Sequence, residues 1–83
     1  MLNDEDINIL TYRFTNILRN AYDPKVTVER LNSLIADAEM IFDIPISNSE
    51  LLDQFKENHA FEYNLYLSFI EERERVQDDL VLD

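Results

Sequence analysis

Apolar residues recur along this chain at the three- and four-residue spacing that is typical of amphipathic helices. The first stripe predicts a helix over about residues 3–22, which Asn3 or Asp4 can cap at its N-terminus. Proline disfavours the helical conformation of the residue before it, so we expect this helix to end ahead of Asp23-Pro24. The apolar stripe of the first helix consists of Ile7, Leu10, Phe14, Ile17, Leu18 and Ala21.

The next segment repeats this spacing and predicts a second helix over about residues 27–42. Thr27 is the expected N-cap of this helix, and Pro45 lies just beyond its expected end. Its apolar stripe consists of Val28, Leu31, Leu34, Ile35, Ala38, Ile41 and Phe42.

The most specific local signal in the chain marks the start of a third helix, expected over about residues 48–57. Ser47 and Glu50 have the spacing of a capping box. Ile46 and Leu51 occupy the flanking positions of a hydrophobic staple. The third helix is expected to turn three side chains inward: Leu51, Leu52 and Phe55.

The last stripe predicts a fourth helix over about residues 60–77, in a segment rich in aromatic residues. We expect a break near residues 58–60, with Asn58 in a left-handed conformation. The alternative is one continuous helix over residues 48–76, about 43 Å long, whose apolar surface a second copy of the chain would cover. The fourth helix is expected to place three side chains in the core: Phe61, Leu65 and Phe69.

The absence of glycine argues against a sheet-rich fold, because tight hairpin turns require positive φ angles. Asn or Asp must then take any left-handed position. We therefore predict an all-α fold, a compact bundle of three or four helices. A chain of 83 residues is expected to form a single acidic helical domain, 1–83, with a short acidic tail at about 78–83.

The net charge of −11 restricts the kinds of partner that the chain can bind. DNA, RNA and anionic membranes would repel it, so we expect no direct nucleic-acid binding and no membrane binding. A basic protein surface would attract it. The lack of cysteine, of a signal-peptide pattern and of a long apolar run predicts a cytoplasmic location.

The same composition argues against several kinds of catalytic and cofactor site. Phosphate-binding loops, dinucleotide fingerprints, EF-hand loops and nucleophile elbows all require glycine, which this chain lacks. His59 is the single histidine, and with Glu62 it supplies two metal ligands at most, whereas a zinc site needs three or four. We therefore expect no catalytic residue, no cofactor and no metal, and predict that the protein is not an enzyme.

Acidic residues in the middle of the chain are the first candidates for binding a partner. Glu50, Asp53 and Glu57 form a row at positions i, i+3 and i+7 of the third helix, opposite its apolar side. Like charges at this spacing destabilise a helix slightly, which favours a functional reason for the row. The run at 71–75, in contrast, interleaves acids with arginine.

Two tyrosines of the fourth helix join this candidate set, because tyrosine combines an apolar ring with a hydroxyl group that needs a partner. The candidate partner-binding residues are Asp37, Glu39, Asp43, Glu50, Asp53, Glu57, Tyr63 and Tyr66.

Size, charge and predicted fold together favour a non-enzymatic protein that occupies a basic, nucleic-acid-binding site on a partner protein and inhibits it by imitating nucleic acid. In size and charge alone, such a chain is similar to small phage inhibitors and to the immunity proteins of nucleases. The alternative is a structural or adaptor bundle, including a homodimer, whose acidity serves only solubility. In that case the acidic row is simply a solvated helix face.

Overall fold

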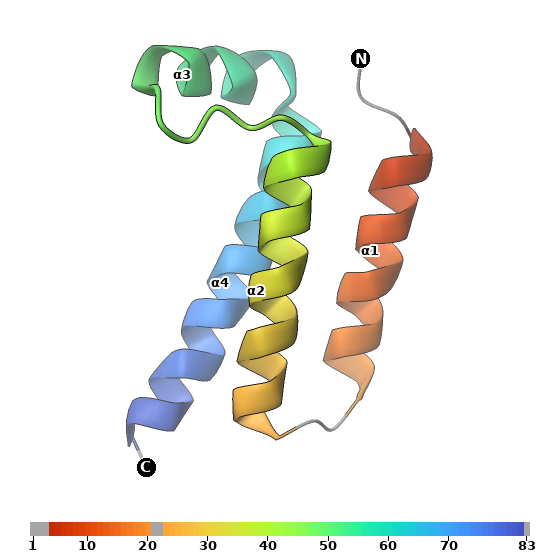
Figure 1. Cartoon of the computed structure of the whole chain (residues 1–83), viewed down its shortest axis with the longest axis vertical. Coiled ribbons are helices and arrows are strands. Elements are labelled where there is room, and N and C mark those ends of the chain that lie inside the picture. Colours follow the sequence, from red (N-terminus) through yellow and green to blue (C-terminus); the bar gives the residue numbers. More distant parts are fainter. Residues whose placement is uncertain (1–3, 21–22, 83) are drawn as a thin grey trace.

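Four helices make up most of the chain in the computed structural model, which describes residues 4–20 and 23–82 (Figure 1). They are α1 (Asp4–Arg19), α2 (Pro24–Ile41), α3 (Ser49–Asn58) and α4 (Ala60–Leu82). These ranges contain no strand, so the predicted all-α bundle is confirmed. Three residues that the predicted first helix included lie outside the described residues: Asn3, Ala21 and Tyr22.

Helices α1, α2 and α4 run side by side, and α3 crosses one end of the bundle (Figure 1). Helix α2 is antiparallel to both α1 and α4 and packs against both of them. Helix α3 lies across the end where α2 finishes and α4 begins, and α4 is the only described helix against which it packs. The Cα radius of gyration is 13.5 Å, against about 12 Å expected for a compact chain of this length, so the bundle is elongated.

The hydrophobic core lies between α1, α2 and α4. Leu31 of α2 and Phe69 of α4 are fully buried, as predicted. The partly buried ring of Phe14 on α1 lies 4.8 Å from the ring of Phe69, which ties α1 to α4 across the bundle. The other buried core residues are Leu10, Ile17, Leu34, Ile35, Ala38, Phe42, Ile44, Phe55, Tyr66 and Val76.

Several apolar residues that were expected in the core are exposed instead. Phe61 is 66% exposed because it lies about 60–140° around α4 from the buried residues Tyr66, Phe69 and Val76. Leu51 is 49% exposed because it lies in the first turn of α3, away from the junction with α4 where that helix is buried. The predictions for two further stripe residues were wrong in the same way: Leu18 and Ile41.

Helix α2 begins three residues earlier than expected. Asp23 is its N-cap, and the side chain of Asp23 accepts a hydrogen bond of 2.9 Å from the backbone N–H of Lys25. Pro24 occupies the first helical position, where its fixed φ angle fits and its missing N–H costs nothing. The prediction that Thr27 caps this helix was wrong, because the backbone N–H of Thr27 already donates to the carbonyl of Asp23.

The end of α2 is a Schellman motif without glycine. Asp43 has a φ angle of 52°, so an aspartate takes the left-handed position as the composition requires. The N–H of Ile44 donates to the carbonyl of Glu39, and the N–H of Asp43 donates to that of Met40. The buried side chain of Ile44 then anchors the chain to the core as it leaves α2.

Helix α3 begins one residue later than the capping box predicted. A turn over residues 45–48, closed by a 3.2 Å bond from the N–H of Asn48 to the carbonyl of Pro45, delays the helix start. Asn48 is the N-cap, and its side chain accepts a 3.0 Å hydrogen bond from the N–H of Leu51. The capping role predicted for Ser47 was therefore wrong, and Ile46 is exposed.

The predicted break between the last two helices is confirmed, and it consists of His59 alone. His59 has φ −133° and ψ 53°, whereas Asn58 remains helical, so the prediction of a left-handed Asn58 was wrong. Helix α4 continues to Leu82, and residues 78–82 are therefore helical where we expected a tail.

Candidate protein-interaction surface

The most exposed group of predicted site residues lies on α3. Glu50, Asp53 and Glu57, which we call the α3 row, are all exposed and lie on the opposite side of the helix from buried Phe55. Asp53 faces Lys56 at 3.9 Å, an exposed pair that contributes little. Glu50 and Glu57 form no ion pair with any of the described residues. The α3 row therefore presents largely uncompensated negative charge to solvent.

Asp43 adds a carboxylate in the connection that leads to α3. It is exposed, and it follows directly after α2 at the left-handed position of the Schellman motif. This backbone conformation fixes where the side chain leaves the chain. Asp43 thus belongs to the same end of the bundle as α3 (Figure 1).

The two acidic candidates on α2 instead have partners inside the molecule. Asp37 forms an ion pair with Arg13 of α1, with 2.7 Å between Oδ2 and Nη1. Glu39 accepts a hydrogen bond of 2.5 Å from the hydroxyl group of Tyr66 on α4. These carboxylates link α2 to its two neighbours, so they do not extend the α3 row.

The two tyrosine candidates differ in burial. Tyr66 is only 6% exposed, and burial together with the Glu39 hydrogen bond raises the pKa of its hydroxyl group. Its hydroxyl group already has a partner within the chain, so in this conformation Tyr66 is a core residue and not a contact residue. Tyr63 is partly buried at the α3–α4 junction, where its ring contacts Phe55 and Lys56 Nζ lies 5.2 Å from the ring centroid.

A second acidic row lies on α4, and the sequence reasoning missed it. Glu71, Glu74 and Asp78, the α4 row, repeat the i, i+3, i+7 spacing of the α3 row and are also exposed. None of the three forms an ion pair with any described residue. The spacing could have revealed this row, but the interleaved arginines in the run at 71–75 suggested that its charge was neutralised.

The arginine nearest to the α4 row pairs with other acids. Arg75 donates two hydrogen bonds to Glu72, of 2.6 and 2.8 Å, and lies 3.6 Å from Asp79. The hydrogen bonds from Arg75 hold the pKa of Glu72 below its ordinary value. This pairing uses Glu72 and Asp79, so the charge of the α4 row remains.

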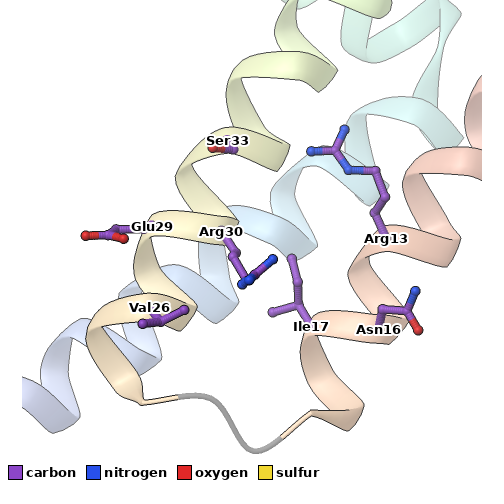
Figure 2. Close-up of a pocket in the computed structure, with 7 residues that line it drawn as sticks. All are labelled: Arg13, Asn16, Ile17, Val26, Glu29, Arg30 and Ser33. Atoms are coloured by element: carbon purple, nitrogen blue, oxygen red, sulfur yellow. The ribbon is translucent and has the colours of Figure 1, made fainter.

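A hollow of about 480 Å³ lies between α1 and α2 (Figure 2). The side chain of Arg30 extends from α2 towards Ile17 of α1 (Figure 2). Ser33 also lines this groove, but the single histidine of the chain lies at the α3–α4 junction, so no Ser–His pair forms here. The lining residues are Arg13, Asn16, Ile17, Val26, Glu29, Arg30 and Ser33.

The single histidine of the chain lies close to one carboxylate. His59 Nδ1 lies 4.0 Å from Glu62 Oε2, and no third ligand joins them, since the described residues contain no metal-binding group of three or more side chains. Within the described ranges, no helix combines the length and apolar character that crossing a membrane requires.

Comparisons with protein-family models, with curated proteins and with solved structures found no match.

Proposed function

We propose that the protein is a non-enzymatic inhibitor whose α3 surface occupies a basic, nucleic-acid-binding site on a partner protein. The observation that carries this proposal is the exposed α3 row, Glu50, Asp53 and Glu57, at one end of the bundle. Asp43 supports it as a further carboxylate at that end.

The distribution of charge along the chain supports an acidic contact surface. Thirteen of the eighteen acidic residues, but only three of the seven basic residues, lie at or after Asp37. Acidic residues spread evenly along the chain would be enough for solubility, which depends mainly on net charge. The concentration of acids in the second half of the chain would instead orient the molecule towards a positively charged partner.

The spacing of the α3 row is close to that of nucleic-acid phosphates. Glu50 and Glu57 are about 10.5 Å apart along the helix axis at 1.5 Å per residue. One strand of B-DNA places three to four phosphates in about the same axial length, at about 3.4 Å each. A basic groove that binds a phosphate backbone would therefore meet a similar number of negative charges on α3.

The position of the row on α3 also favours binding. Helix α3 projects across the end of the bundle and contacts only α4 among the described helices, so a partner could approach its outer side without obstruction. Exposed Leu51 lies beside the row on the same helix and could add apolar contact area.

The proposal is tested by reversing the charge of each row in turn. The triple substitution Glu50→Lys, Asp53→Lys and Glu57→Lys should abolish capture of the partner from a lysate of the native cell. The matched control, Glu71→Lys, Glu74→Lys and Asp78→Lys, changes the net charge equally on α4 with the same spacing. This α4 variant should weaken capture only slightly, because its charges attract the partner at long range without contacting it.

Two further measurements separate the proposal from the solubility alternative. DNA or RNA should displace the protein from its captured partner, because both claim the same positive surface. Capture should also weaken steeply between low and high salt. If the α3 triple variant binds as the parent does and nucleic acid fails to compete, the proposal is wrong and the acidity serves solubility.

A further inference from the structure

The junction between α3 and α4 is one residue away from a continuous helix. The N–H of His59 donates to the carbonyl of Phe55 at 2.8 Å, and the N–H of Tyr63 donates to the carbonyl of His59 at 3.0 Å. Both bonds have the i to i−4 pattern of an α-helix. What the bend interrupts is the helical bonding of the N–H groups of residues 60–62 to the carbonyls of residues 56–58.

Nothing in the local sequence prevents this helix from forming. The segment 56–62, KENHAFE, has neither proline nor glycine, and Lys, Glu and Ala are good helix formers. Moving His59 from φ −133° and ψ 53° to about −63° and −42° would join α3 and α4. The product would be a rod of about 34 residues, roughly 51 Å long.

The contacts that hold the bend are contacts between α3 and α4 themselves. The rings of Phe55 and Tyr63 have centroids 6.4 Å apart, and Lys56 lies over the same tyrosine. On a straight helix, residues eight positions apart are separated by about 12 Å along the axis, so Phe55 and Tyr63 of one chain would lose contact. When α4 leaves the bundle as the hinge straightens, the site that it occupies against α1, α2 and α3 becomes empty.

We propose that a second copy of this chain can fill that site, giving a dimer in which the two copies exchange α4. In each half, residues 4–58 of one copy would bind α4 of the other through the contacts present in the single chain, including Phe55 with Tyr63 and Phe14 with Phe69. The fit is therefore already established within the molecule. The exchange adds the helical hydrogen bonds of two straightened hinges, and it loses the freedom of one independent molecule.

Two consequences distinguish this dimer from the binding proposed for the α3 row. Two copies that each carry a net charge of −11 repel, so salt should strengthen the dimer, whereas salt should weaken capture of a basic partner. Exchange also requires α4 to leave the core, so the dimer should form on refolding and persist on dilution. The two proposals can therefore fail independently.

The test compares His59→Ala with His59→Gly. Both variants remove the imidazole and its contacts with Phe55 and Glu62, and they differ only in helix preference at the hinge. Replacing glycine by alanine raises the equilibrium constant for helix formation about fivefold at each hinge, and the dimer has two hinges. After refolding from urea over a range of concentrations, the dimer dissociation constant that applies during refolding should be about thirtyfold lower for His59→Ala than for His59→Gly. Size-exclusion chromatography of the refolded samples separates the persistent dimer from the monomer, and the dimer fraction at each concentration gives both constants. The unsubstituted protein should fall between the two variants.

Hydrogen exchange at the hinge identifies the kind of dimer. In the α4-exchanged dimer the N–H groups of residues 60–62 are helical and should exchange slowly, while in the monomer they lack those acceptors. Equal oligomerisation of the two variants would overturn the proposal. A dimer whose 60–62 amides exchange as fast as in the monomer would overturn it too, because the copies would then associate side by side. A monomer whose 60–62 amides exchange hydrogen slowly would also overturn the proposal, because the hinge would then be straight without a second copy.

Discussion

Helices α2 and α3 both carry a stripe of apolar residues, but the two stripes have different surroundings. Helix α2 lies between α1 and α4 and buries Leu31, Leu34, Ile35 and Ala38. Helix α3 packs on α4 alone among the described helices and buries only Phe55 within its length. An amphipathic pattern thus becomes core only where a second helix covers it, and the free side of α3 remains available for charge.

The difference implies that the stability of the fold depends on α1, α2 and α4, while α3 is a lightly attached element. Such elements open locally at lower free energy than the core does.

The largest effect is expected for Leu34→Ala, which removes a fully buried side chain of α2 and should lower the free energy of unfolding by about 2–5 kcal/mol. Leu51→Ala is the matched control on α3 and should change it by less than about 0.5 kcal/mol. Urea unfolding measures both. If the two substitutions cost the same, the contrast between the helices is wrong.

A smaller loss is expected when the link between α2 and α4 is removed. Tyr66→Phe deletes the hydroxyl group that donates to Glu39 and should cost about 1.5 kcal/mol, as for a hydrogen bond to a charged group. Thermal unfolding at neutral pH measures this loss. Tyr12→Phe is the control, since Tyr12 is 69% exposed, and it should melt with the parent protein.

The same tyrosine should give the fold a sensitivity to alkali. The pKa of Tyr66 in the folded protein is raised above the ordinary value near 10, so the unfolded chain loses this proton first as pH rises. Stability contributed by the neutral hydroxyl group is complete below about pH 10 and is lost as pH rises towards the folded pKa. Tyr66→Phe should therefore show a flatter stability profile from pH 9 to 11 than the parent protein. Equal slopes would contradict this.

The start of α3 should respond to its N-cap by about 1 kcal/mol. Asn48→Ala removes the side chain that accepts from the N–H of Leu51. Ser47→Ala, one residue earlier, should leave the unfolding midpoint unchanged. Because α3 opens locally, hydrogen exchange of its amides should detect the Asn48 effect more clearly than global unfolding does. If Ser47→Ala has the larger effect, Ser47 and not Asn48 caps α3.

The smallest effect concerns an ion pair that lies within α4 and joins no other helix. Arg75 holds the pKa of Glu72 low, so the stability from this pair is present above the unfolded pKa, near 4.3, and is lost as pH falls through the folded pKa. Glu72→Gln should remove no more than about 0.5 kcal/mol of this acid dependence. Glu71→Gln is the control, and urea unfolding between pH 5 and pH 2 measures both variants. If Glu72→Gln and Glu71→Gln change the pH dependence equally, the pair contributes nothing.

The sequence was enough to predict a bundle of three or four helices, because three- and four-residue periodicity depends on burial over many positions. Helix starts were less predictable, since they depend on single side chains. The chain offered Ser47 and Asn48 as adjacent caps for α3, and only the turn over residues 45–48 decides between them. Helix α1 ends ahead of Asp23-Pro24, as predicted, but the sequence did not reveal that Pro24 also occupies the first position of α2.

The sequence was enough to identify acidic residues as candidates for the site, but it could not show which of them have partners inside the molecule. The α3 row followed from its spacing, because opposite faces of a short helix are defined by sequence alone. The internal partners of Asp37 and Glu39 could not be predicted, since Arg13 lies 24 residues away and Tyr66 lies 27 residues away. Which carboxylates remain exposed depends on how helices distant in sequence pack.

The left-handed aspartate at the end of α2 has a consequence for engineering this molecule. Glycine would adopt the conformation of Asp43 without the steric cost that a Cβ atom adds, so Asp43→Gly should make the protein more stable. It would also delete one carboxylate next to α3. A screen for thermal stability would therefore select against charge at the proposed binding end, and a screen for binding would select against stability. Asp43 is thus a position where natural variants of this chain should reveal which of the two requirements has been stronger.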